Sequence, residues 1–143
     1  MIQINPYLTF NGNCAKVMQF YQECLGGELV LLTVKDSPMA KDWPAHMQDN
    51  ILHSSLTSES FILLGSDMGG PGDKMIKGNT ISLSLNCSTE EELNRLFDAL
   101  SRNGEITRPL HQFFGGTIGT LTDQFGMAWI FYYNKNILPG CIL

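Results

Sequence analysis

The sequence has little charge. Charged residues make up 16% of its 143 residues, against about a quarter in an average globular protein. Its 9 basic and 14 acidic residues give a net charge of −5, so the chain lacks the basic surface that nucleic-acid binding requires. Because 43% of the residues are hydrophobic, the chain can bury a core, and intrinsic disorder is excluded. The sparse charge indicates that part of the surface is buried in an oligomer.

Hydrophobic runs long enough to cross a membrane are also missing. Runs such as residues 29–32 and 61–64 contain four residues each, whereas a spanning helix needs about 20. The N-terminus shows neither a basic region nor a long apolar stretch, so no secretory signal peptide is expected. These absences predict a cytoplasmic protein without a membrane partner.

The four cysteines form no CxxC pair. If Cys14 and Cys24 share a helix, ten residues separate them by about 15 Å, which exceeds the ~7 Å that a disulfide can bridge. We therefore expect reduced, mostly buried thiols, as in a cytosolic protein.

What the sequence does contain is a clear order of strands and helices. Residues 2–10 alternate between apolar and polar side chains, which is typical of a half-buried strand. Asn13 is a candidate helix cap, and apolar residues at helical spacing predict a helix over residues 14–25. A strand over residues 28–35, an irregular loop over 36–50 and a hairpin of strands over 51–57 and 61–66 follow.

A glycine-rich linker over residues 68–78 precedes a similar second half. Residues 80–87 alternate again, and Ser88 with Glu91 forms a candidate capping box before a helix over residues 89–102. Further strands are expected over residues 105–108, 117–122 and 127–133, the last two joined by a type I turn at residues 123–126.

The two halves repeat one order of elements. Phe20 and Phe97 occupy similar places and are 77 residues apart, close to half the chain length. We therefore predict an α+β fold of two βαβββ modules, about residues 1–67 and 79–134, within a single domain over residues 1–143. Each module offers a four-stranded sheet with a helix on one face, and the two other faces are expected to curve around a cavity.

Several short sequence motifs are spread over residues 2–131. They are NPYLTFNG from Asn5, FYQECLGG from Phe20, ILHSSL from Ile51, LGSD from Leu64, FG from Phe114, DQFG from Asp123, and Trp129. Together they resemble the PhnB-like proteins of the vicinal oxygen chelate superfamily, which includes glyoxalase I, bleomycin-resistance proteins and extradiol dioxygenases. Phe114 and Gln124 depart from the family pattern, which more often has tryptophan at the first position and proline or lysine at the second.

The resemblance implies the glyoxalase/bleomycin resistance/dioxygenase fold and a pocket, but no particular reaction. Members of the superfamily include metalloenzymes, metal-free binders and proteins without an assigned activity. Some PhnB-like proteins carry the name demethylubiquinone methyltransferase. That name is unsupported here, because no glycine-rich loop leads from a strand into a helix with an acidic residue about 20 positions later.

Metal ligands in the superfamily's enzymes lie on the first and last strands of each module, as His or Gln and as Glu. The corresponding positions here hold residues that bind divalent metals poorly, namely Asn5, Pro6 or Tyr7, then Leu63 or Leu64, then Ser82, and finally Ile130. We therefore expect neither a metal ligand nor a cofactor.

Of the three histidines, His53 is the candidate catalytic residue. His46 and His111 fall in predicted loops, and no HxH or HxxxH spacing is present. On its strand, His53 lies opposite Leu52 and Leu56. If the leucines pack on a helix, His53 points into the cavity, where an imidazole suits a general base because it titrates near neutrality. A hydrogen-bonded structural histidine is the alternative.

The predicted pocket wall is moderately polar. The candidate ligand contacts are Tyr7, Thr9, Ser55, Ser82 and Ser84, with a solvated sheet face as the alternative interpretation. Trp129 is either a further ligand contact or a core residue. Phe114, beside Phe113 in a glycine-flanked loop, is either a cover for the pocket mouth or a dimer contact.

These observations favour a metal-free protein that binds a small molecule, with an unassigned reaction in which His53 is the base. The alternatives are a metal-dependent lyase or dioxygenase of the glyoxalase type, and a resistance protein that sequesters its ligand without catalysis. A homodimer is expected, because apolar loops and the tail at residues 137–139 would expose more apolar surface than a monomer usually carries.

Overall fold

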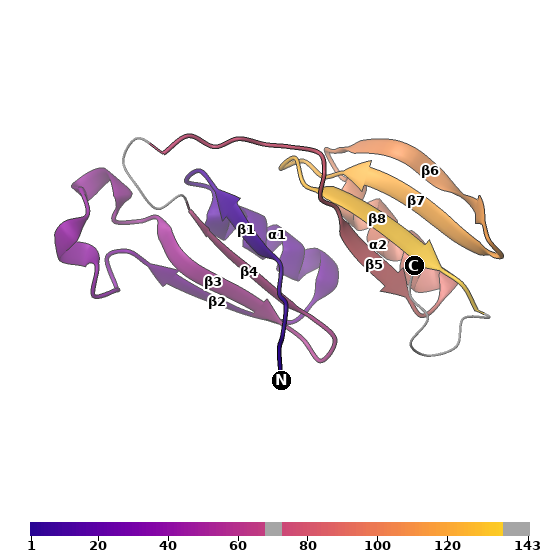
Figure 1. The fold of residues 1–143 in the computed structure, drawn as a ribbon, viewed down its shortest axis with the longest axis horizontal. Helices are drawn as coiled ribbons and strands as arrows, with labels where there is room; N and C mark the ends of the chain where they lie inside the picture. Colours follow the sequence, from indigo (N-terminus) through magenta and orange to yellow (C-terminus); the bar gives the residue numbers. More distant parts are fainter. Residues whose placement is uncertain (68–72, 136–143) are drawn as a thin grey trace. The chain divides into compact units, whose positions relative to one another are not determined.

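The computed structural model describes residues 1–67 and 73–135. The chain divides into two compact units, Met1–Ile76 and Lys77–Leu143, and each contains a four-stranded sheet with a helix packed against it (Figure 1). The first unit consists of β1 (Tyr7–Phe10), α1 (Cys14–Leu25), β2 (Glu28–Thr33), the 3₁₀ turns η1 (Ala40–Asp42) and η2 (Ala45–Met47), β3 (Ile51–Thr57) and β4 (Ile62–Asp67). The second consists of β5 (Leu83–Cys87), α2 (Glu90–Ser101), β6 (Glu105–Phe113), β7 (Gly116–Thr122) and β8 (Ala128–Tyr133).

Both sheets have the same strand order. The first sheet runs β1-β4-β3-β2, and the second runs β5-β8-β7-β6. In each, the first strand pairs in parallel with the last, and the other neighbours are antiparallel. This shared order confirms the predicted α+β fold with two βαβββ modules. The single-domain organisation and the common cavity stay predictions.

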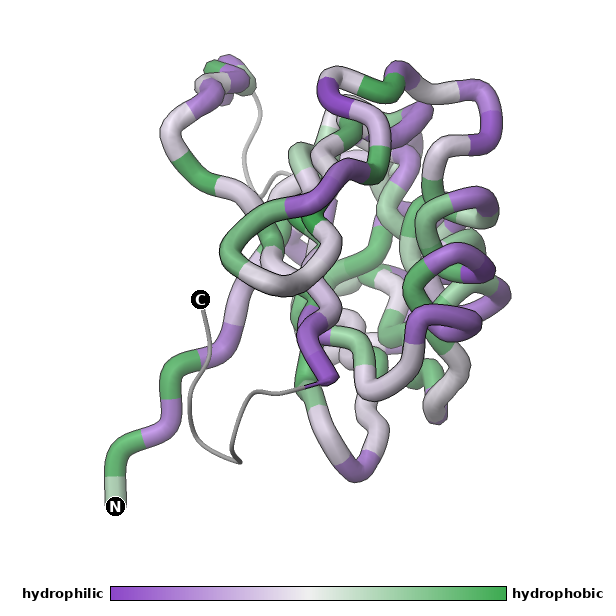
Figure 2. Tube along the Cα trace, turned by 90° about the vertical axis from the view of Figure 1, so that its right-hand side faces the viewer, coloured by the Kyte–Doolittle hydropathy of each residue, from purple (hydrophilic) through white to green (hydrophobic). Residues whose placement is uncertain are grey.

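The helices bury equivalent residues against their sheets. Both are 12 residues long, and they begin at residues 14 and 90, which are 76 residues apart. Val17 therefore corresponds to Leu93, and Tyr21 corresponds to Phe97; all four side chains are buried. The predicted offset of 77 residues, which pairs Phe20 with Phe97, is one residue too long. In Figure 2 the hydrophilic residues of the helices lie on the side away from the strands, as amphipathic helices require.

Two strands begin later than the alternating patterns predict. β1 begins at Tyr7 rather than at residue 2, and Ile2 and Ile4 are 91% and 92% exposed. β5 likewise begins at Leu83 rather than at residue 80, and Ile81 is 80% exposed. The alternation continues upstream of both strands, but pairing with β4 and β8 begins only at Tyr7 and Leu83, so alternation alone does not mark where a strand begins.

β6 is longer than predicted, because it runs to Phe113 rather than to residue 108. Pro109 inside this segment argues against a strand, because proline has no N–H to donate to a neighbour. β6 is an edge strand of its sheet, however, and an edge strand tolerates proline on the side that has no neighbouring strand. The register shifts between Arg108 and His111. His111 therefore lies on a strand and not in the predicted loop.

The start of α2 lies one residue later than the predicted capping box. Thr89, not Ser88, is the N-cap, and its hydroxyl accepts a hydrogen bond from the Glu92 N–H at 3.1 Å. The Glu92 carboxylate in turn accepts from the Ser88 N–H at 2.9 Å. The motif is present, but Glu92 replaces Glu91 as its acidic member.

None of the helices in residues 1–67 and 73–135 combines the length and the apolar character that crossing a bilayer requires. The linker predicted over residues 68–78 and the apolar tail over 137–139 lie partly or wholly outside the described residues.

Candidate functional site

The open face of the first sheet carries half of the predicted site residues. Alternate residues of a strand point to opposite faces, and Leu8, Ser54 and Leu56, on the face toward α1, are buried. The register places the other alternate residues together on the open face. They are Tyr7 and Thr9 of β1, Glu28, Val30 and Leu32 of β2, His53, Ser55 and Thr57 of β3, and Ile62, Leu64 and Ser66 of β4.

Two side chains of this face meet. Oη of Tyr7 lies 3.3 Å from Nδ1 of His53, and the two ring centroids are 5.9 Å apart. Because β1 and β3 lie on either side of β4, the contact spans that strand. His53 lies on the face away from α1, as the base hypothesis requires, and its catalytic role stays a prediction.

Hydroxyl and aliphatic groups surround the Tyr7–His53 pair. Thr9 lies opposite Ser66 in the register, and Ser55 lies opposite both Val30 and Leu64. This face therefore offers hydrogen-bonding groups beside apolar surface, the combination that small-molecule sites use.

Val30 and Leu32 were not predicted as site residues. They are 54% and 37% exposed, and Leu32 is the cross-strand partner of His53. In the sequence, the run at residues 29–32 resembles a strand buried on both faces. Only the pairing of β2 with β3 shows that alternate residues of the run lie on the open face.

The opposite side of β3 is a packed core. Ser54 donates a hydrogen bond to the Gly65 carbonyl at 2.8 Å, and its Oγ lies 3.5 Å from Sγ of Cys14. Burial raises the pKa of the Cys14 thiol to about 11. Since the thiolate is the nucleophilic form, Cys14 is a structural residue at neutral pH.

Asp67, the last residue of β4, holds the first unit together. Its Oδ1 accepts hydrogen bonds from the N–H groups of Gly12 at 2.8 Å and Cys14 at 3.0 Å, and its Oδ2 accepts from the Ile51 N–H at 2.8 Å. Asn13, the predicted cap of α1, makes no side-chain capping bond. The carboxylate of Asp67 caps the helix from another strand, since a negative group stabilises a helix N-terminus.

The second unit places the two candidate serines differently. Ser84 lies on β5 opposite Ile130, on the face away from α2, whereas Ser82 precedes the strand. Both are exposed. Ser84 thus has a position equivalent to the open-face residues of the first sheet, and Ser82 is outside the sheet.

Trp129 is a core residue. It is 3% exposed, and its indole Nε1 donates a hydrogen bond to Oδ2 of Asp123 at 2.9 Å. Oδ1 of Asp123 accepts from the N–H groups of Phe125 at 2.8 Å and Met127 at 3.1 Å, which organises the predicted turn. The burial of Trp129 favours the core alternative, and its role as a ligand contact stays a prediction.

Phe114 lies at the tip of the β6–β7 hairpin. Its φ is 45° and that of Gly115 is 76°, as a two-residue type I′ loop requires. Phe114 is 80% exposed, and its ring meets the ring of Phe113 edge-on, with centroids 4.5 Å apart. A bulky residue with positive φ is strained, and the roles of pocket cover and dimer contact both stay predictions for it.

The other two histidines belong to other elements. His46 is an exposed residue of η2. His111 is an exposed residue of β6 whose Nδ1 lies 2.8 Å from the Pro109 carbonyl oxygen. Within the described ranges 1–67 and 73–135, no three His, Cys, Asp or Glu side chains are grouped in a way that holds a metal ion.

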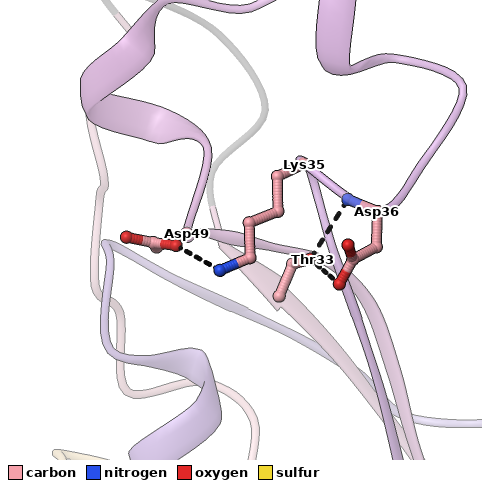
Figure 3. A network of polar contacts seen from close by, with 4 residues as sticks. All are labelled: Thr33, Lys35, Asp36 and Asp49. Atoms are coloured by element: carbon pink, nitrogen blue, oxygen red, sulfur yellow. Dashed lines mark hydrogen bonds and ion pairs between the residues drawn. The ribbon is translucent and has the colours of Figure 1, made fainter.

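A small charged network lies beyond the end of β2 (Figure 3). Lys35 Nζ lies 2.9 Å from Oδ1 of Asp49, and Thr33 donates a hydrogen bond to Asp36 at 2.9 Å. The Asp49 carboxylate raises the pKa of Lys35. Because the Lys35 and Asp49 side chains are 54% and 86% exposed, this ion pair contributes little to stability.

Comparison with known proteins gives a family match over nearly the whole chain. The model of a family described as 3-demethylubiquinone-9 3-methyltransferase matches residues 2–131. The protein YjdN of Escherichia coli (strain K12) is 31% identical over 137 residues, which cover 89% of this chain and 92% of YjdN.

Solved structures have the same fold. Protein PA1353 from Pseudomonas aeruginosa is 40% identical with a TM-score of 0.80, over 94% of this chain and 98% of that one. A putative 3-demethylubiquinone-9 3-methyltransferase, PhnB protein, from Bacillus cereus is 23% identical with a TM-score of 0.72, over 92% and 99%. A glyoxylase/bleomycin resistance protein/dioxygenase domain from Frankia sp. EAN1pec shares the fold at 12% identity, with a TM-score of 0.64 over 95% and 94% of the two chains.

Proposed function

We propose that this member of the family described as 3-demethylubiquinone-9 3-methyltransferase binds a small organic molecule on the open face of its first sheet. The chain is a PhnB-like protein of the vicinal oxygen chelate superfamily. The observation that carries the proposal is the contact between Tyr7 and His53. It brings two groups that donate and accept protons together on a face with both hydroxyl and aliphatic neighbours.

If the protein turns over its ligand, we assign the role of general base to His53. An imidazole is a suitable general base near neutral pH, and His53 is exposed on the open face. Tyr7, Thr9 and Ser55 are the proposed ligand contacts of the first unit. Ser84 of β5 and Ser82, which directly precedes that strand, are the proposed contacts of the second unit.

The methyl transfer in the family's description finds no support in the described strand-to-helix connections. A dinucleotide-type site places a glycine-rich loop between a strand and the following helix. Here residues 11–13 join β1 to α1, and residues 88–89 join β5 to α2. Neither connection contains the GxGxxG pattern, so small-molecule binding with an unassigned reaction is the better supported function.

The test begins with native mass spectrometry of gently purified protein, which identifies a ligand that remains bound. With that ligand as substrate, His53→Ala is expected to lower turnover by about 10²-fold or more, the usual contribution of general acid–base catalysis. Thr57→Val, a change on the same strand and face, is the matched control and should retain turnover. An unchanged rate in His53→Ala would reduce the residue to a ligand contact.

We further propose that residues 1–143 form a single domain. The support is the repeated sheet order of the two units. Urea unfolding should then show one cooperative transition. Two separate transitions would contradict a single domain.

A cytoplasmic homodimer is the assembly that we propose. Sparse charge supports the dimer, as does the exposed apolar side chain of Phe114. The free thiols of Cys14 and Cys87 fit a reducing compartment. Light scattering at micromolar concentration should give a mass near twice 15.9 kDa, and the mass of a single chain would contradict the dimer.

A further inference from the structure

In the contact between Tyr7 and His53, either group could donate the hydrogen bond, but one choice of donor suits both groups better. A neutral imidazole carries one N–H and one acceptor nitrogen, whereas a phenol has an O–H and a weakly basic oxygen. A bond from the phenol O–H to Nδ1 pairs the better donor with the better acceptor. The reverse bond, from an Nδ1–H to the phenol oxygen, uses the poorer acceptor.

The direction of this bond decides which nitrogen meets a ligand. When Nδ1 of His53 accepts from Tyr7, the ring proton of the neutral imidazole must lie on Nε2, since the hydrogen bond of one nitrogen sets the state of the other. The Nε2–H is then a hydrogen-bond donor, and Nδ1 holds the only lone pair that can take a proton.

The charged residues of the first sheet indicate whether its ligand is charged. The four strands of the first unit contain no lysine and no arginine, and their acidic residues are Glu28 and Asp67. Asp67 is buried, with its carboxylate bonded to backbone N–H groups. Phosphate and sulfate groups are usually bound by arginine, lysine or clustered N–H groups, so this face suits an uncharged ligand better.

We propose that Tyr7 is a positioning residue that holds His53 in the Nε2–H tautomer, so that the open face binds the carbonyl oxygen of an uncharged, partly apolar molecule. Val30 and Leu32, at 54% and 37% exposure, supply the apolar surface for such a molecule. This inference rests on the proposed small-molecule site and names its ligand class.

The tautomer can be measured without any ligand, by long-range ¹H–¹⁵N correlation spectra of the imidazole rings at a pH where they are neutral. His111 is an internal reference, because its Nδ1 faces the Pro109 carbonyl oxygen at 2.8 Å, which only accepts. His111 is therefore expected in the Nδ1–H form and His53 in the Nε2–H form. An Nδ1–H pattern for His53 would overturn the inference and leave the binding proposal standing.

A substitution separates the positioning role from a merely structural one. Tyr7→Phe keeps the ring and removes the O–H, so the spectrum of His53 should move toward a mixture of tautomers. The spectrum of His111 should not change. Thr9→Val, on the same strand and face, is the control and should leave both rings unchanged. An unaltered His53 spectrum in Tyr7→Phe would show that the phenol does not set the tautomer.

The ligand class has its own test, with acetophenone and phenyl phosphate as probes of similar size. Acetophenone at millimolar concentration should shift the His53 ring signals and the amide signal of Ser55 at least tenfold more than phenyl phosphate does. A larger response to phenyl phosphate, or no response to acetophenone, would refute the ligand class. If native mass spectrometry also finds no bound molecule, the binding proposal fails as well.

Discussion

Replacing Asp67 tests whether one carboxylate holds the first unit together. Asp67→Asn keeps the shape of the side chain but removes its charge and one acceptor oxygen. If the amide oxygen takes the place of Oδ1, the bonds from Gly12 and Cys14 remain in weaker, neutral form. The N–H of Ile51 then faces an NH₂ group and loses the 2.8 Å bond that it makes to Oδ2.

The expected loss of stability follows from these three bonds. A hydrogen bond to a charged group contributes about 1.5–3 kcal/mol, and a neutral one contributes about 1 kcal/mol. Losing one charged bond and weakening two others should lower the free energy of unfolding by about 3–5 kcal/mol. Because a domain is stable by only about 5–15 kcal/mol, this loss is a large fraction of the total.

Urea unfolding measures the loss, and hydrogen exchange locates it. Exchange of the Ile51 amide should accelerate more than exchange at the centre of α2, which belongs to the other unit. Asp49→Asn is the matched control, since it removes the same charge from an exposed ion pair and should leave the unfolding midpoint almost unchanged. A loss below about 1 kcal/mol, or unchanged exchange at Ile51, would refute the role given to Asp67.

Two further predictions concern other residues. The folded-state pKa of Cys14, about 11, lies above the unfolded value of 9.0, so its contribution to stability should be complete below pH 9 and disappear as the pH rises toward 11. At about 1.4 kcal/mol per pKa unit, wild type should lose up to about 3 kcal/mol relative to Cys14→Ala over that range; parallel pH profiles would contradict the effect of burial. Phe114→Asn creates an Asn-Gly loop that accepts positive φ, and it should raise stability by about 1 kcal/mol in urea unfolding. A lower unfolding midpoint would show that contacts of the phenylalanine ring outweigh its strain.

The fold could be predicted from the sequence where its local patterns repeat. Both helices appear within one residue of their predicted bounds, because apolar spacing and capping residues are local signals. Strand ends were harder to predict, since they depend on where pairing with the neighbouring strand begins. The alternation around Ile4 and Ile81 is indistinguishable from that of a strand until the register with β4 and β8 is known.

The candidate site was accessible only in part. The alternation of β3 was enough to separate His53 from Leu56 and to place it opposite the helix-packed face. The roles of Asp67 and Val30 depend on which strands are neighbours, and strand order is not written in any local pattern. Trp129 illustrates the same limit, because a strand that is apolar on both faces does not reveal which face is enclosed.

The capping of α1 by Asp67 also fixes an order of events during synthesis. The carboxylate that accepts the Cys14 N–H lies 53 residues further along the chain, so at about 5–20 residues per second the ribosome makes it roughly 3–11 s after the helix start. β4, the neighbour of β1 in the described sheet, is synthesised after a similar interval. The nascent first half therefore passes through a period in which β1 lacks its sheet partner and α1 lacks its cap, which leaves both more open to chaperones and proteases than in the folded protein.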